Sequence, residues 1–145
     1  MGFTGNIIYD LHMVWRWVLL AVALVTLLKA LAGWFGKQRW TELDDRLGMF
    51  FTIAVDIQFL LGMILWFVGP WRITNAGALM SNPLGRFMVI EHPLFLLIAL
   101  ALAHIGRGRS RKAKTDVAKH RTAFIFYLLS FLFIVLIFIL RTTVG

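Results

Sequence analysis

The sequence predicts an all-α membrane protein: a bundle of four transmembrane helices in up-down order, with both termini on the non-cytoplasmic side. Three observations carry this prediction. Apolar stretches of about 20 residues recur four times, basic residues gather on one side of them, and tryptophans mark their ends. The chain has 145 residues, of which 60% are hydrophobic, and its mean hydropathy is +0.81. Four spans and their loops use residues 1–145 as a single transmembrane domain.

Each apolar stretch is long enough to cross a hydrocarbon core ~30 Å thick. The four stretches are Met13 to Trp34, Gly48 to Val68, Phe87 to Ile105 and Thr122 to Leu140. The first lacks a preceding basic segment and is too long for a signal peptide, so we expect it to be retained as a span.

Local sequence signals predict where the later helices begin, end or bend. Gly69 and Pro70 end the second helix. Asn82 followed by Pro83 is typical of a helix start, with Asn as N-cap and Pro at the first helical position. Pro93 then predicts a kink in the third helix. The fourth stretch contains no internal polar group beyond Ser130, so we expect it to act as scaffold.

The basic residues fix the expected orientation. Two loops on one side carry ten of them, while the other side carries only Arg72, Arg86 and Arg141. The ten are Lys37, Arg39, Arg46, Arg107, Arg109, Arg111, Lys112, Lys114, Lys119 and Arg121. Positive residues mark the cytoplasmic side, and such loops also attract anionic lipid headgroups. The net charge of +8 therefore indicates topology, and we expect no nucleic-acid partner.

Several chemistries lack the residues they need. The chain has no cysteine, which excludes disulfides, iron–sulfur clusters, thiolate metal sites and covalent haem attachment. The sequence has no convergent Ser/His/Asp set and no glycine-rich phosphate loop. It therefore gives no support for an enzyme that works by nucleophilic catalysis.

The informative residues are polar groups inside the spans, because such groups usually face the bundle interior and are functional candidates. They are His12, Arg16, Lys29, Asp56, Gln58, Glu91, His92 and His104. At about 1.5 Å of rise per residue, His12, Arg16, Glu91 and His92 all fall near the outer face.

Depth predicts which of these groups meet. His12 and Arg16 are four residues apart and share a helix face, and an Arg16–Glu91 ion pair is the simplest structural explanation for that charge. Nearer the inner face we expect a Lys29–Asp56 ion pair.

Gln58 shares a face with Gly62. A small residue there permits close helix packing, and the Gln58 amide is placed to hydrogen-bond across the interface.

Two histidines at matching depth on different helices are the arrangement that a b-type haem needs, with two axial nitrogens in an apolar slot. His12 and His92 are then the expected iron ligands. Arg16 and Glu91 complete the expected cofactor site, where Arg16 pairs with a propionate or with Glu91. The alternative is that both histidines are interfacial residues bonded to backbone or to Glu91. A second haem held by His104 and His120 is less favoured, and a bare metal site would have too few ligands.

The stretches "LHMVWRWVLL", "DIQFLLGMILWFVGP" and "IEHPLFLLIALALAHIG" resemble a family of small bacterial four-helix membrane proteins labelled cytochrome b-like. The matching positions are His12, Arg16, Trp17, Gln58, Gly62, Glu91 and His92. The resemblance covers the first three spans and implies haem b in a bacterial cytoplasmic membrane.

The leading functional hypothesis is therefore a small membrane b-type cytochrome, or haem-bearing electron-transfer subunit, that works with the quinone pool or a respiratory complex. A second hypothesis is a non-catalytic accessory subunit of a larger membrane complex, and a third is a proton-coupled or metal transporter. In each case we expect the lipid bilayer as environment, and a homo-oligomer or a larger assembly as context.

Overall fold

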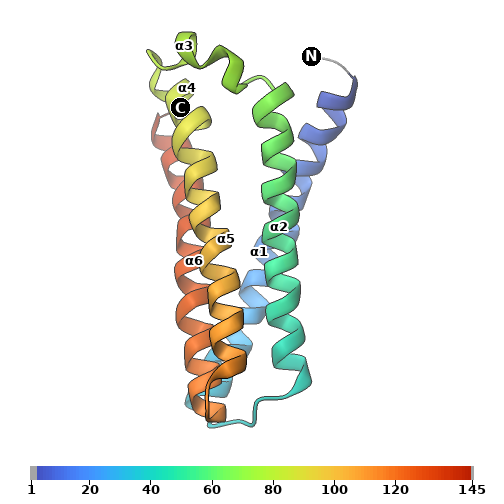
Figure 1. Ribbon diagram of the computed structural model, residues 1–145, viewed down its shortest axis with the longest axis vertical. Coiled ribbons are helices and arrows are strands. Elements are labelled where there is room, and N and C mark those ends of the chain that lie inside the picture. Colours follow the sequence, from blue (N-terminus) through green and yellow to red (C-terminus); the bar gives the residue numbers. More distant parts are fainter. Residues whose placement is uncertain (1–2, 145) are drawn as a thin grey trace.

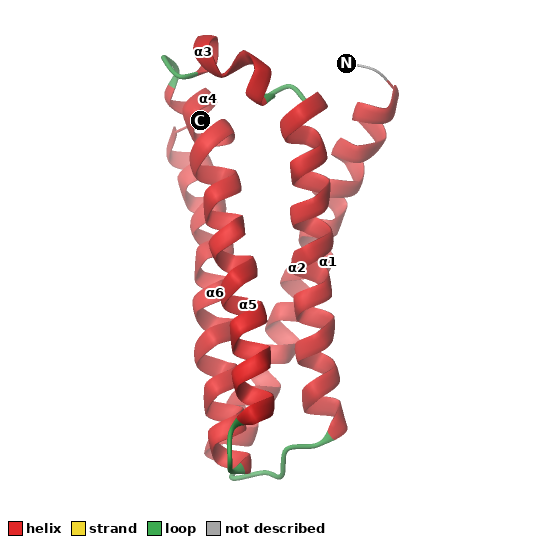
Figure 2. Cartoon of the chain, viewed as in Figure 1, coloured by secondary structure: helices red, strands yellow, loops and turns green. Residues whose placement is uncertain are grey.

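The computed structural model describes the backbone of residues 3–144 and the side chains of residues 7–143. The chain is built from helices and short connections (Figure 2). The four long helices are α1 (Phe3–Phe35), α2 (Glu42–Val68), α5 (His92–Lys112) and α6 (Asp116–Val144). Between α2 and α5 lie four short ones: η1 (Ile73–Asn75), α3 (Ala76–Leu79), α4 (Pro83–Arg86) and η2 (Phe87–Glu91).

Four helical segments are long and apolar enough to cross a membrane, namely Ile7–Phe35, Glu42–Val68, Pro83–Lys112 and Asp116–Thr143. Each contains one of the four stretches that the sequence predicts. The prediction of an all-helical chain is confirmed, and its four long helical segments have the length and apolar character of those in a multi-pass membrane protein.

Each long helix packs against two others: α1 against α2 and α6, and α5 against α2 and α6. The α1–α2 and α5–α6 connections lie at one end of the bundle (Figure 1). We call this the basic end, because Lys37, Arg39, Lys112 and Lys114 lie there. The chain termini and the segment between α2 and α5 lie at the other end, which we call the termini end.

The core is made from alanines, branched aliphatic residues and two aromatic rings at helical spacing. It comprises Leu19, Ala23, Leu27 and Ala30 of α1, Phe51, Ala54 and Val55 of α2, Leu96, Ala99 and Ala103 of α5, and Ala123, Tyr127 and Ile134 of α6. The alanines let the helix backbones approach closely. The Ser130 hydroxyl donates to the Ala99 carbonyl at 2.7 Å and ties α6 to α5.

The third membrane-crossing segment begins as the sequence predicts. The Asn82 side chain accepts hydrogen bonds from the backbone N–H groups of Leu84 (2.9 Å) and Gly85 (3.2 Å), and Pro83 occupies the first turn. The disturbance expected at Pro93 takes the form of a π-helical turn, η2, in which the His92 N–H donates to the Phe87 carbonyl.

Candidate functional site

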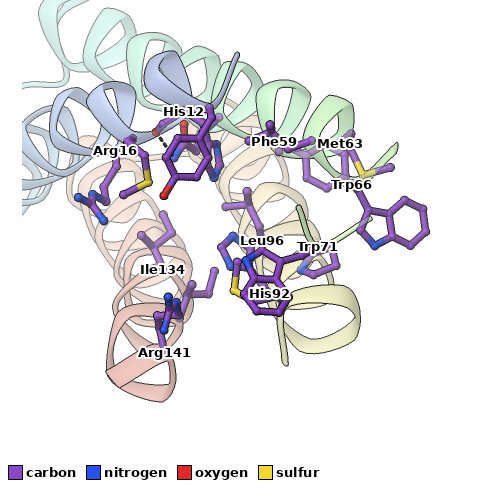
Figure 3. A pocket seen from close by; sticks show the side chains of 18 of the residues that line it. His12, Arg16, Phe59, Met63, Trp66, Trp71, His92, Leu96, Ile134 and Arg141 are labelled. Atoms are coloured by element: carbon purple, nitrogen blue, oxygen red, sulfur yellow. Dashed lines mark hydrogen bonds between the residues drawn. The ribbon is translucent and has the colours of Figure 1, made fainter. Parts of the chain in front are cut away.

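A cavity of about 200 Å³ opens at the termini end of the bundle, among all four long helices (Figure 3). Its walls are mainly aromatic and aliphatic, and five polar side chains project from different helices into this lining: His12, Arg16, Gln58, His92 and Arg141. An apolar pocket with a few convergent polar groups is the usual form of a small-molecule or cofactor site.

His12 and His92 face each other across the cavity. Their ring centroids are 6.1 Å apart, and the ring planes are inclined by 37°. A metal ion bound axially by two imidazole nitrogens, each at about 2 Å, would separate the centroids by roughly 6 Å. Within the described residues, Nδ1 of both rings is buried without a hydrogen-bond partner, so each ring keeps a nitrogen that no protein group occupies.

Two guanidinium groups share this cavity. Arg16 enters from α1, and Arg141 enters from the last turns of α6 (Figure 3). The Arg16 guanidinium lies over the Trp17 ring (5.0 Å) and the Phe138 ring (5.4 Å). Its Nε is buried and has no acceptor among the described residues. The cavity therefore combines apolar walls with two cations, which suits a flat apolar ligand that carries carboxylates.

The α1 wall is held in register by α2. The Gln58 side chain donates to the His12 carbonyl at 3.0 Å, the hydrogen bond across the interface that the sequence predicts. The Trp15 indole donates to the Ala54 carbonyl at 2.8 Å. Gly62 lies beside the His12 ring, and a Cβ at that position would be in ordinary van der Waals contact with it, 3.4 Å from His12 Cε1.

The α5 wall is shaped by Pro93. In a regular α-helix the amide of residue 93 would donate to the carbonyl of Val89, but proline has no N–H. The Trp66 indole donates to that carbonyl instead, at 2.9 Å. Trp66 also lines the cavity. The π-helical turn that ends at Glu91 presents His92 to the cavity, and such turns are frequent at functional sites.

The donor set fits a haem better than a bare ion. Among the described residues, no group of three His, Cys, Asp or Glu side chains gathers to hold a metal. Two histidines are enough for an iron whose four remaining ligands come from a porphyrin. Arg16 and Arg141, which form no ion pair with any described residue, match the two propionates that a haem carries.

Two predicted ion pairs are wrong. Glu91 pairs with Arg86, its Oε1 lying 3.4 Å from Arg86 Nε, and not with Arg16. Lys29 pairs with Asp44, with Nζ and Oδ1 at 2.6 Å, and not with Asp56. In both cases the partner lies just before the predicted start of a span, Arg86 before Phe87 and Asp44 before Gly48. The helical structure begins earlier than the apolar stretch at both places.

Asp56 bonds to His104 instead, at 2.7 Å between Oδ1 and Nε2. His120 is fully buried, its ring contacts Trp40 in a tilted arrangement with centroids 5.1 Å apart, and a Cβ at Gly33 would overlap it. The sequence places His120 among surface basic residues, and the close approach of α1 and α6 buries it. His104 and His120 thus serve separate contacts and form no pair.

The cavity includes residues that the sequence assigns to other tasks. The sequence uses Arg141 only to predict the orientation of the helices across the membrane. It predicts Trp66 and Trp71 as anchors at the membrane interface. Matching their depth to His12 and His92 would have flagged all three, since each lies near the termini end of its segment.

No family model, curated protein or solved structure matches the chain. The case for a function rests on the geometry of this cavity.

Proposed function

We propose that the protein is a small membrane b-type cytochrome that binds one haem b in the cavity at the termini end and passes electrons between the quinone pool, or a respiratory complex, and a redox partner. The observation that carries this proposal is the facing pair His12 and His92, with ring centroids 6.1 Å apart. The resemblance to cytochrome b-like proteins points the same way.

Each cavity residue has a role under this proposal. His12 and His92 would hold the haem iron through their imidazole nitrogens, and Arg16 and Arg141 would neutralise the propionates. Haem b, when bound, supplies a reversible one-electron iron couple. Gln58 and Trp66 position the two histidines through the His12 carbonyl and the Val89 carbonyl. The apolar walls would exclude water from a bound haem, which would tune its potential.

The proposed setting is a bacterial cytoplasmic membrane, crossed four times in alternate directions with both termini outside. Support comes from the basic end, whose ten lysines and arginines would face the cytoplasm. The haem would then lie toward the outer leaflet. In this position it could accept electrons from a periplasmic donor or from quinol at the membrane interface.

The test is a reduced-minus-oxidised visible spectrum of protein purified in mild detergent from cells supplied with a haem precursor. We expect a sharp low-spin b-type α-band and about one haem per chain by pyridine haemochrome. His12→Ala and His92→Ala should each remove the low-spin spectrum, because each leaves iron with one axial ligand.

His104→Gln is the matched control, since it deletes a histidine outside the cavity and should keep the full spectrum. If folded wild-type protein binds no haem, or if both single variants keep a low-spin band, the proposal fails.

A non-catalytic accessory subunit is the second candidate. It is favoured by the Asp56–His104 pair, which lies on the outside of the bundle where a neighbouring membrane protein would cover it. Stable association with a large complex, together with a flat visible spectrum, would select this candidate. The transporter hypothesis gains no such support, because the ionisable pairs Lys29–Asp44, Asp56–His104 and Arg86–Glu91 occupy separate places.

A further inference from the structure

An ionisable pair faces outward from the bundle. Asp56 of α2 and His104 of α5 bond through Oδ1 and Nε2 at 2.7 Å, and their side chains are 42% and 48% exposed. The two helices lie side by side on the near side of Figure 1. The pair is therefore on the surface that four membrane-spanning helices would turn toward lipid.

The pair lies within the membrane-crossing parts of both helices, toward the basic end. Asp56 is eight residues past Gly48, where the second predicted span begins, which is about 12 Å at the rise of an α-helix, and His104 comes one residue before Ile105, where the third predicted span ends. Ionisable groups at such depth nearly always face a bundle interior or pair within protein, because hydrocarbon does not solvate them. A protein surface that covers this pair would remove that cost.

The surroundings of the pair suit close contact with another helix. Ala101, His104 and Gly108 follow one face of α5 at spacings of three and four, and all three are exposed. A Cβ added at Gly108 would meet nothing within 4 Å. Small residues on either side of a polar group are typical of helix–helix interfaces in membranes. Ile53 and Leu60, also exposed, flank Asp56 on α2.

We propose that a second copy of this chain covers the α2–α5 face and forms a two-fold dimer. Two copies inserted in the same orientation are related by an axis along the membrane normal, and this axis places α2 of each copy opposite α5 of the other. Asp56 then faces His104 of the partner subunit at the same depth. The bond within one chain uses Oδ1 and Nε2. With His104 as imidazolium beside the Asp56 carboxylate, Nδ1–H is left to donate to Asp56 Oδ2 of the other copy.

Charge complementarity thus selects a second copy as the occupant. The α2–α5 face presents the Asp56 carboxylate as an acceptor beside the His104 ring as a donor. The two-fold rotation sets each acceptor opposite the donor of the other copy. The four groups would close a cyclic network in the dimer interface. This inference rests on the proposed membrane crossing and is independent of haem.

Cysteine cross-linking tests the dimer directly, because the chain contains no cysteine of its own. Ala101→Cys places a thiol on α5 beside the proposed axis, and Leu129→Cys places one on exposed α6 at a similar distance from the basic end. Since α5 faces α2 of the other copy, the two Ala101→Cys thiols lie diagonally across the interface, and a short bifunctional maleimide reagent is needed to join them. In native membranes treated with this reagent we expect a cross-linked dimer from Ala101→Cys and almost none from Leu129→Cys. Equal cross-linking of the two variants would overturn the proposal.

The second measurement is dimer dissociation in detergent, followed by native mass spectrometry. Asp56→Asn and His104→Gln should each weaken the dimer several-fold, while His12→Ala should leave it intact. A purified chain that stays monomeric at all concentrations, or a dimer that neither substitution weakens, overturns the proposal. Haem content is measured on the same samples, so that failure of the dimer and failure of the cytochrome assignment are seen separately.

Discussion

At the scale of single residues, the buried carboxylate of Asp44 is neutralised by a local partner. The Asp44 side chain is 2% exposed, and its Oδ1 accepts from Lys29, whose side chain is 28% exposed. Asp44 Oδ2 accepts from the backbone N–H and the hydroxyl of Thr41. One carboxylate thereby caps the start of α2 and fixes α1 beside it.

Sequence reasoning found Lys29 but not its partner. It considered only residues inside predicted spans, and α2 begins at Glu42, six residues before the apolar stretch that starts at Gly48. Helix ends of this kind are set by caps such as Thr41, while hydropathy marks only the lipid-facing part. The same reason explains why Arg86 was missed as the partner of Glu91.

We predict that Lys29→Met lowers the free energy of unfolding by about 1–3 kcal/mol, because it leaves a buried carboxylate oxygen without its donor. Methionine keeps the apolar stem that packs along α1. The measurement is denaturant unfolding in mixed micelles, followed by circular dichroism.

Arg46→Met is the matched control for Lys29→Met. It breaks the Arg46–Glu42 ion pair, whose side chains are 59% and 76% exposed. Exposed pairs of this kind contribute about 0.5 kcal/mol or less. Equal losses for the two variants would show that Lys29 is not anchored by a buried partner.

At the scale of elements, Pro93 and Trp66 act as a unit. Proline removes one backbone donor from the third membrane-crossing segment, and the Trp66 indole from α2 supplies a donor to the Val89 carbonyl. The sequence predicts the disturbance at Pro93, because proline cannot donate. It does not reveal that the Trp66 side chain, 23 residues before Val89, satisfies the Val89 carbonyl. That contact depends on how α2 is rotated about its axis.

A double-mutant cycle should reveal this coupling. Trp66→Phe should destabilise the wild-type background by about 1–3 kcal/mol, because it leaves the Val89 carbonyl unsatisfied. In the Pro93→Ala background the same substitution should cost clearly less, since residue 93 regains an N–H. Thermal unfolding of the four proteins in one detergent measures the difference.

Trp66 also lines the cavity, so lost packing contributes to the cost in both backgrounds. Only the coupling between the two positions reports on the shared carbonyl. A coupling energy of zero would mean that the indole bond is incidental to the π-helical turn.

At the scale of the whole molecule, apolar length and periodicity predict the four helices well, because a span of lipid imposes one dominant constraint on the chain. The candidate site was predicted in part. His12, Arg16 and His92 were identified from depth alone, and the structure brings them into one cavity. Arg141 lies 129 residues after His12 in the sequence, and its arrival beside the histidines follows from the packing of α6 against α1, which no local pattern encodes.

The orientation of the bundle yields the last prediction. If the ten basic residues at one end face the cytoplasm, then the α3 segment faces outward and the α5–α6 connection faces inward. Gly77 and Lys114 are exposed at these two opposite ends, and a side chain at Gly77 meets no neighbour within 4 Å. In intact bacterial cells, a membrane-impermeant thiol reagent should therefore label Gly77→Cys rapidly and leave Lys114→Cys unlabelled. After cell lysis both should react, which controls for accessibility. Labelling of Lys114→Cys in intact cells would reverse the orientation and would place the cavity, with His12 and His92, toward the cytoplasmic leaflet.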